Sequence, residues 1–227
     1  MAKIYCIANQ KGGVGKTTTA VNLAAALSQL SFNVLLVDLD PQGNATTGSG
    51  LEKNNLVQSV YEVLLDRADI KKVITHSTSG YDILGSNRKL AAAEEELLSA
   101  ARKELRLKTK LDEVSGQYDV IIIDCPPTLS ILTINAFCAA DGLIIPMTCE
   151  YYSLEGVSDL LLSIRAVREQ VNSGLVITGL LRVKFDPRIT LQREVSEQLS
   201  GYFGSSVFSS VIPVSYTHLT LPTKLEV

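Results

Sequence analysis

The sequence predicts a three-layer α/β domain with a mostly parallel central sheet and helices on both faces. Short runs rich in β-branched residues alternate with segments of helical period, as in β-α-β units joined by right-handed crossovers. Several of these runs are apolar throughout, such as Val-Ile-Ile-Ile at 120–123. Continuous apolar runs indicate strands that are covered on both faces, as in a parallel sheet.

Six segments are predicted as strands because each is a short apolar run, mostly rich in β-branched residues. They are Lys3–Ala8, Asn33–Leu39, Tyr118–Asp124, Gly142–Met147, Leu175–Leu181 and Ser206–Ile212. Residues 50–116 are more helical and more charged than the rest. Because no linker separates them from the other segments, we expect them to elaborate the same sheet.

Three segments between the strands carry apolar residues at helical spacing, so one face of each helix is expected to pack on the sheet. The faces are Ala20, Leu23, Ala24, Leu27 and Leu30; then Leu154, Val157, Leu161, Ile164 and the stem of Arg168, with Leu160 and Val167 beside them; then Leu191, Val195, Leu199 and Tyr202.

Composition limits the classes of protein that this chain can be. It has 227 residues, 46% hydrophobic and 20% charged, with a net charge of −3. Such a chain buries about 70–75% of its unfolded surface, so it needs no disulfide or structural metal and is not mainly disordered. The chain has no tryptophan, and only 6% of its residues are aromatic. This composition argues against a surface that stacks on single-stranded bases. The acidic total still allows a local basic patch.

The cysteines and the apolar segments point to a reducing cytosol. Cys6, Cys125, Cys138 and Cys149 form no CxxC pair, and two histidines add no zinc-ligand spacing, so we expect buried thiols. The apolar stretch at 4–8 is too short for a secretory signal. Polar side chains interrupt residues 17–37, so that segment is not predicted to cross a membrane.

The strongest functional signal is the run Lys11-Gly12-Gly13-Val14-Gly15-Lys16-Thr17-Thr18, between a predicted strand and a predicted helix. Glycines let the backbone curl so that its N–H groups and the helix N-terminus face an anion. Lys16 is placed to reach the β- and γ-phosphates, and the Thr17 hydroxyl to bind Mg²⁺. The strict G-x-x-x-x-G-K-[ST] pattern needs glycine where Gln10 stands, and this departure comes with an additional lysine, Lys11.

Three aspartates follow predicted strands, at the ends where open α/β sheets bind ligands. Asp124 ends the 120–123 run, where an acid that holds Mg²⁺ through water belongs; the alternative is a turn acid before Pro126. Asp40 is predicted to orient the attacking water and to join Thr17 and Asp124 as a metal ligand; the alternative is a cap or turn acid. For Asp38, a structural and a functional role stay open.

Together these motifs closely resemble the ParA/Soj family of chromosome- and plasmid-partitioning ATPases, which are P-loop NTPases of the deviant Walker A class. The resemblance runs to about residue 213 and is carried by residues 8–19, 37–44, 123–127 and 150–156. It implies an ATP hydrolase with ATP and Mg²⁺ as cofactors. No DNA-reading domain precedes the loop, as in the short, chromosomal type.

The resemblance also implies an ATP-dependent homodimer. Lys11 matches the signature lysine of the family, which reaches the partner's phosphates. Gly12 matches the position where the two loops approach each other, and Asp40 matches the catalytic carboxylate. The catalytic residues are then Lys11, Lys16 and Asp40. The expected nucleotide contacts are Lys11, Gly12, Gly13, Val14, Gly15, Lys16, Thr17, Thr18 and Pro213. The ATP-bound dimer is expected to bind DNA without sequence preference, on the nucleoid of the bacterial cytoplasm and not on a membrane, until a ParB-like DNA-bound partner stimulates hydrolysis.

Two segments carry local positive charge that could contact DNA phosphates with salt-dependent affinity. Residues 102–110 have a net charge of +4, but a solvated charged face is the favoured interpretation there. Residues 182–193 contain four basic residues and one acid, Asp186, which gives a net charge of +3. DNA binding is the prediction for this segment, and a solvated charged face is the alternative. The candidate DNA contacts in this second segment are Arg182, Lys184, Arg188 and Arg193.

The C-terminal residues depart from the family pattern. Residues 215–227 alternate threonine and leucine, contain Pro222, have no helical period, and look like translated adapter sequence joined to a truncated frame. We therefore expect a C-terminally incomplete ATPase domain over 1–214 and a non-family tail over 215–227.

Three other functions fit parts of the sequence less well than partitioning does. A MinD-like membrane-cycling ATPase would need a C-terminal amphipathic helix, which the tail does not supply, and residues 40–44 favour the partition type. A nitrogenase-reductase-like role would need cysteines that bridge a cluster between subunits, and no pair suits this. A weakly hydrolysing adaptor, in which ATP only controls dimerisation, is disfavoured by Lys11 and Asp40.

Overall fold

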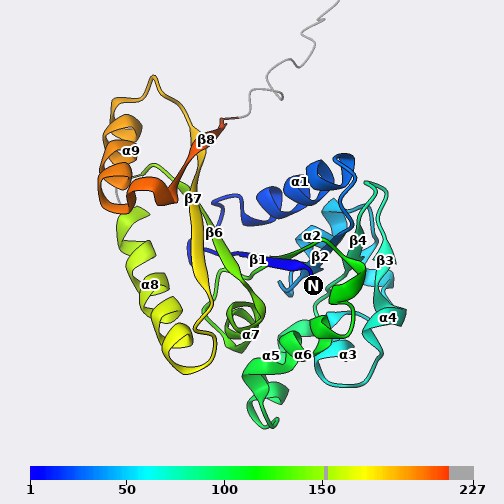
Figure 1. Ribbon diagram of the computed structural model, residues 1–227. Helices are drawn as coiled ribbons and strands as arrows, with labels where there is room; N and C mark the ends of the chain where they lie inside the picture. The colour runs from blue at the N-terminus through cyan, green and yellow to red at the C-terminus, as the bar shows by residue number, and fades with distance from the viewer. Residues whose placement is uncertain (151–152, 215–227) are drawn as a thin grey trace, which may run out of the picture.

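A single eight-stranded sheet forms the centre of the molecule in the computed structural model (Figure 1). The structure describes residues 1–150 and 153–214, with the backbone alone for 153–157, so the predicted tail at 215–227 lies outside the described residues. The strands are β1 (Lys3–Ile7), β2 (Val34–Asp38), β3 (Thr75–His76), β4 (Asp82–Leu84), β5 (Val120–Asp124), β6 (Gly142–Thr148), β7 (Val176–Phe185) and β8 (Val207–Pro213).

The strand order, β3-β4-β2-β5-β1-β6-β7-β8, confirms the predicted mostly parallel sheet. Every neighbouring pair is parallel except β3 and β4, which are antiparallel at one edge. The six predicted strands are all present. The short strands β3 and β4 extend the same sheet, as expected of a sheet elaboration within 50–116.

Helices cover both faces of the sheet (Figure 1). Residues of α5 to α9 pack on one face, around Phe137 and Leu160, whereas α1 packs Ala20 and Ala24 on the other. The helices are α1 (Lys16–Gln29), α2 (Asn44–Gly48), α3 (Val60–Leu64), α4 (Ile70–Val73), α5 (Leu90–Leu98), α6 (Arg106–Asp112), α7 (Ile131–Ala139), α8 (Ser153–Gln170) and α9 (Thr190–Phe203), with 3-10 turns η1 (Lys53–Asn55), η2 (Lys103–Leu105), η3 (Ser115–Gln117) and η4 (Gly204–Ser206).

The helical faces differ from the prediction at their ends. Leu30 is exposed because α1 ends at Gln29, before that residue turns toward the sheet. Leu191 is exposed in the first turn of α9, and Tyr202 is exposed in the last turn, where its neighbour Phe203 packs against the core instead. Leu154 and Val157 lie outside the described side chains.

Arg168, whose stem was expected on the core, is exposed near the end of α8, whereas the expectation about the cysteines is confirmed. All four cysteines are buried and unpaired. Within the described ranges, no helix combines the length and the apolar character needed to cross a membrane. The register of the central strands matters most for function: Asp38 on β2 and Ile7 on β1 both pair with Asp124 on β5. The loops that follow β1, β2 and β5 therefore leave the sheet side by side.

Candidate functional site

The loop between β1 and α1 has the backbone that an anion-binding loop needs. Gly13 and Gly15 have φ angles of 72° and 76°, in the left-handed region that glycine adopts at little cost. Gly15 is the N-cap of α1, and it forms no side-chain capping hydrogen bond. The N–H groups of the first helical turn are therefore available to an anion.

Three lysines lie on this loop, two from the segment that runs from β1 into α1 and one from β7. Lys16 is buried at the start of α1, and its Nζ donates to the backbone carbonyl of Lys11 over 3.2 Å. Burial lowers the pKa of Lys16, although the charges of Asp124 and Asp40 oppose the shift. The Lys11 ammonium forms an ion pair with Glu150, which follows β6. The third lysine is Lys184 of β7, whose Nζ donates to the carbonyl of Gly13 over 2.9 Å.

Two register-paired carboxyl groups lie beneath the loop. Asp38 and Asp124 are both fully buried. Burial raises the pKa of Asp124 to about 8, with Asp38 and Asp40 adding to the shift and Thr17 and Lys16 opposing it. Burial also raises the pKa of Asp38 to about 6, against the hydrogen bonds that it accepts. Desolvation thus makes an added cation favourable here.

Asp124 has the character of a metal ligand. Both of its carboxylate oxygens are buried without a hydrogen-bond partner in the described part of the chain, whereas buried polar atoms are nearly always satisfied. Across that same part, no cluster of three or more His, Cys, Asp or Glu could hold a metal. A cation at Asp124 would therefore need hydroxyl, phosphate and water oxygens, the ligands that Mg²⁺ commonly takes. Thr17, the second residue of α1, lies near Asp124 and fits this set.

Asp40 is held in place by a network that fixes its loop. Its Oδ1 accepts the N–H of Gln42 over 2.9 Å, and its carbonyl accepts the Ser86 hydroxyl over 2.8 Å. Asp38 accepts the N–H of Asp40 over 3.2 Å and both the N–H and the hydroxyl of Thr46, each over 2.7 Å. These contacts give Asp38 a structural role, which sequence reasoning left open. Sequence reasoning missed Thr46 and Ser86, since Ser86 follows β4, which was not predicted.

The four candidate DNA contacts lie in different surroundings in the structure. The Arg182 guanidinium turns toward its own subunit: it donates to Ser196 Oγ over 2.7 Å and to the carbonyl of Phe208 over 2.8 Å, so it ties β7 to α9 and β8. Lys184 lies on the phosphate loop. Arg188 and Arg193 are exposed, and Arg188 forms a two-pronged ion pair with Asp186.

The basic segment at 102–110 is largely neutralised by its surroundings. Arg106 and Lys110 both form ion pairs with Asp66, and Lys110 also pairs with Glu113. Lys108 pairs with a further acid on its own helix, one turn away. These contacts support the solvated charged face that the sequence favoured there.

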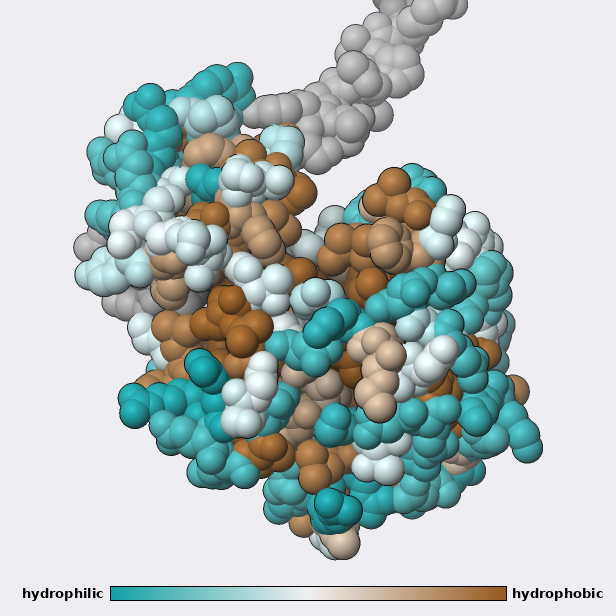
Figure 2. Space-filling view, in the orientation of Figure 1, coloured by the Kyte–Doolittle hydropathy of each residue, from teal (hydrophilic) through white to brown (hydrophobic). Residues whose placement is uncertain are grey.

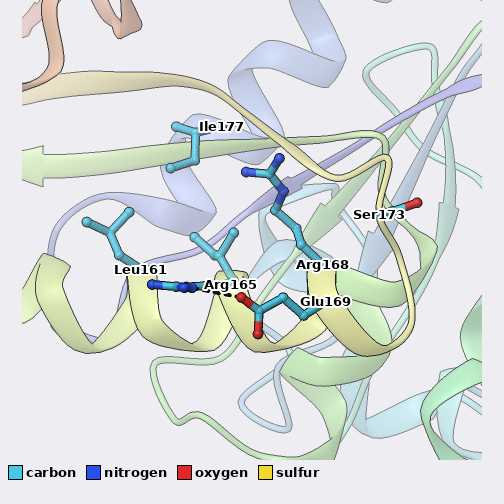
Figure 3. Close-up of a pocket in the computed structure, with 7 residues that line it drawn as sticks. Leu161, Arg165, Arg168, Glu169, Ser173 and Ile177 are labelled. Atoms are coloured by element: carbon cyan, nitrogen blue, oxygen red, sulfur yellow. Dashed lines mark hydrogen bonds and ion pairs between the residues drawn. The ribbon is translucent and has the colours of Figure 1, made fainter.

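Two cavities lie away from Lys16, Asp38 and Asp124. One of about 610 Å³ lies between α1 and strands β6 to β8, and Figure 2 shows an apolar hollow between these parts of the molecule. Its apolar lining includes Ile144 and Phe208, and Thr18 contributes to its wall. The other, of about 470 Å³, lies between α8 and the start of β7, with Arg165 and Glu169 paired on its wall (Figure 3).

Pro213, the predicted nucleotide contact outside the loop, is exposed at the end of β8, where it pairs with Phe185 of β7.

Comparisons with known proteins agree with this geometry. A family profile described as an AAA domain matches residues 2–177. The sporulation initiation inhibitor protein Soj of Bacillus subtilis is 49% identical over 94% of this chain and 85% of its own length. The chromosome partitioning protein ParA of Myxococcus xanthus is 44% identical over 94% of this chain and 76% of its own length.

Solved structures give the same fold. A Mycobacterium smegmatis protein described as cobyrinic acid a,c-diamide synthase, with bound ADP and magnesium, superposes with a TM-score of 0.91 at 39% identity, over 95% of this chain and 88% of that one. A plasmid partition protein from Borrelia burgdorferi superposes with a TM-score of 0.82 at 30% identity, over 95% of this chain and 91% of that one. The P-loop, the parallel sheet and these relatives together show that the chain belongs to the ParA/Soj family of partitioning ATPases, which are ATP hydrolases.

Proposed function

We propose that this chain is a Mg²⁺-dependent ATPase whose ATP-bound homodimer binds DNA without sequence preference during chromosome or plasmid partitioning. One observation carries the proposal: an open loop with left-handed Gly13 and Gly15 lies above Asp124, a buried acid whose oxygens have no partner in the described chain. ADP and magnesium in the M. smegmatis structure support the same assignment.

Each residue of the site has a chemical task in this proposal. The N–H groups of residues 12–18 and the Lys16 ammonium bind the phosphates, and Thr17 and Asp124 hold Mg²⁺, with Asp40 as a further ligand. Bound Mg²⁺ neutralises phosphate charge. Asp40 orients the attacking water, since the hydrogen bonds to Gln42 and Ser86 fix its loop.

Two observations support a dimer with shared sites. A Cβ built on Gly12 meets no atom within 4 Å, and its φ lies outside the left-handed region, so nothing within the described chain requires glycine there. A partner loop that approaches closely would require it. Lys11 is partly exposed beside this opening, where its charge can reach a neighbouring subunit's phosphates and act as an arginine finger does.

DNA binding is assigned to Arg188 and Arg193, which are exposed and follow the end of β7. Contacts from such side chains go to the phosphates and carry no sequence information. Family membership supports a ParB-like DNA-bound activator, and the bacterial nucleoid as the place of action. The nucleotide contact of Pro213 and the ATPase domain over 1–214 are part of the same proposal.

The test is ATP hydrolysis by the purified chain with Mg²⁺, in the presence and absence of nonspecific duplex DNA. We expect slow turnover that requires Mg²⁺ and increases when DNA is added together with a ParB-like protein from the same genome. A chain that binds ATP and dimerises but shows no turnover under any of these conditions would support the adaptor function instead.

A further inference from the structure

The carboxyl end of β7 has an irregular backbone at one residue. The pairing of β7 with β8 shifts register between Val183 and Phe185, and Lys184 lies within this shift. Lys184 has a φ of 53°, in the left-handed region. A lysine rarely adopts that conformation, and irregularities of this kind beside functional sites serve to re-aim a side chain.

The irregularity directs Lys184 to the phosphate loop. Its Nζ donates to the carbonyl oxygen of Gly13 over 2.9 Å, across 171 positions of sequence. A Cβ built on Gly15 would lie 4.0 Å from the side chain of Val183, so the end of β7 runs along the loop. Lys184 also adds positive charge beside Glu150, the residue that pairs with Lys11.

From this geometry we infer that Lys184 is a positioning residue of the phosphate loop; the inference rests on the proposed ATPase function. A trans peptide carries its C=O and N–H on opposite sides. Holding the Gly13 carbonyl therefore fixes the direction of the Val14 N–H, one of the donors in the loop. Gly13, on one side of this peptide, leaves it freer to rotate than a residue with a side chain would, so Lys184 lowers the ordering cost of binding ATP.

This role replaces the DNA contact that the sequence suggested for Lys184. The ammonium is already committed to the loop, whereas Arg188 and Arg193, four and nine residues later, extend from the surface. Lys184 and these arginines therefore serve different ligands, although the charge run in the sequence groups them together.

The experiment compares Lys184→Gly with Lys184→Arg and with the matched control Arg102→Gly. Glycine keeps the left-handed backbone and removes only the side chain, whereas arginine keeps a donor that can reach the carbonyl. Arg102 is an exposed basic residue with a φ of 51°, at the N-cap of η2, so its change to glycine makes the same backbone and charge alteration away from the loop. The measurements are ATP affinity by equilibrium titration, KM and kcat, and retention of the ATP-saturated protein on nonspecific DNA.

We expect Lys184→Gly to raise the dissociation constant and KM for ATP about three- to tenfold, with kcat and DNA retention at saturating ATP unchanged. Arginine should restore the affinity, and Arg102→Gly should match the unmodified chain. Unchanged ATP affinity in Lys184→Gly overturns the inference, and reduced DNA retention alone would return Lys184 to the DNA surface. Because titration needs no turnover, failure of the proposed hydrolysis is distinguishable from failure of this inference.

Discussion

The ends of β2 and β5 and the end of β7 face the same loop but are built in opposite ways. At β2 and β5 the charged groups are buried: Asp38, Asp124 and Lys16 lie inside the domain, and their pKa values are shifted by desolvation. After β7 the cations Arg188 and Arg193 are exposed, and Arg188 forms a two-pronged ion pair with Asp186 at the surface.

In the proposed function this difference corresponds to two tasks: the buried groups act on ATP, and the exposed cations bind DNA. Buried groups on rigid strands have fixed positions and act strongly on charge, as phosphate chemistry requires. Exposed cations act weakly and additively, as binding to a long polyanion requires. Substitutions at the buried edge should therefore have large effects on ATP, whereas those at the exposed edge should have smaller effects on DNA.

The largest effect is expected for Lys16→Ala. Removing the ammonium leaves the phosphates without a buried charge-assisted donor, so ATP affinity should fall about 100-fold or more in equilibrium titration. The control is Lys108→Ala, on the neutralised surface of α6, which should bind ATP as the unmodified chain does. If Lys16→Ala keeps its ATP affinity, the claim that the buried groups dominate ATP binding is contradicted.

Asp40→Ala should lower kcat about 100- to 10,000-fold, because the water loses the carboxylate that orients it. ATP affinity should be retained, since the Lys16 and glycine contacts remain. Single-turnover assays together with titration separate the two effects. Normal turnover in Asp40→Ala would assign the catalytic carboxylate elsewhere.

The buried acids make stability depend on pH. The folded-state pKa of Asp124 is raised to about 8, so the folded protein binds more protons than the unfolded chain, and this contribution is lost as pH rises through about 8. Without nucleotide and with a chelator, the free energy of unfolding should fall between pH 6 and pH 8, at a slope approaching about 1.4 kcal/mol per unit.

Asp124→Asn, which cannot ionise, is the control for this slope. Urea unfolding of the two proteins at pH 6, 7 and 8 should give a flatter dependence for the variant. Equal slopes would show that Asp124 keeps an ordinary pKa in the folded state.

Arg188→Glu tests the exposed edge. Reversing one charge should weaken DNA retention of the ATP-bound protein about five- to tenfold and reduce the salt slope by about 1 per subunit. Arg165→Glu is the matched control, because Arg165 is 77% exposed and ion-paired with Glu169 (Figure 3), as Arg188 is 74% exposed and paired with Asp186. Equal losses in both variants would mean that only net charge matters.

The smallest effect is expected for Glu150→Gln, which frees Lys11 from its ion pair within the subunit. Since exposed ion pairs contribute about 0.2–1 kcal/mol, ATP-dependent dimerisation should strengthen by no more than about fivefold. Sedimentation of the variant in an Asp40→Ala background measures this. Weaker dimerisation would show that Glu150 itself contacts the partner.

The sequence predicted the buried edge better than the exposed one, for physical reasons. Apolar runs and a strand–loop–helix motif are local patterns, so the strands, the loop and the place of Asp124 could be predicted. The two-residue strand β3 and the three-residue strand β4 are too short for a periodic signal.

The direction of side chains near the end of β7 had no such local signal. Arg182 and Lys184 belong to one basic run, yet Arg182 turns to Ser196 and Phe208 and Lys184 turns to Gly13. The direction depends on a register shift with β8, a long-range pairing that no local pattern records. The contact of Ser86 with Asp40 is of the same kind, since 46 positions separate the two residues.

The most direct test is DNA retention of the unmodified chain, Asp40→Ala and Lys16→Ala in Mg·ATP and in Mg·ADP, each at low and moderate salt. If the buried site controls the exposed surface, Asp40→Ala will remain on DNA with ATP and leave with ADP, and added salt will weaken its retention. Lys16→Ala will not be retained above its ADP level. Equal, nucleotide-independent retention of all three proteins would contradict the account.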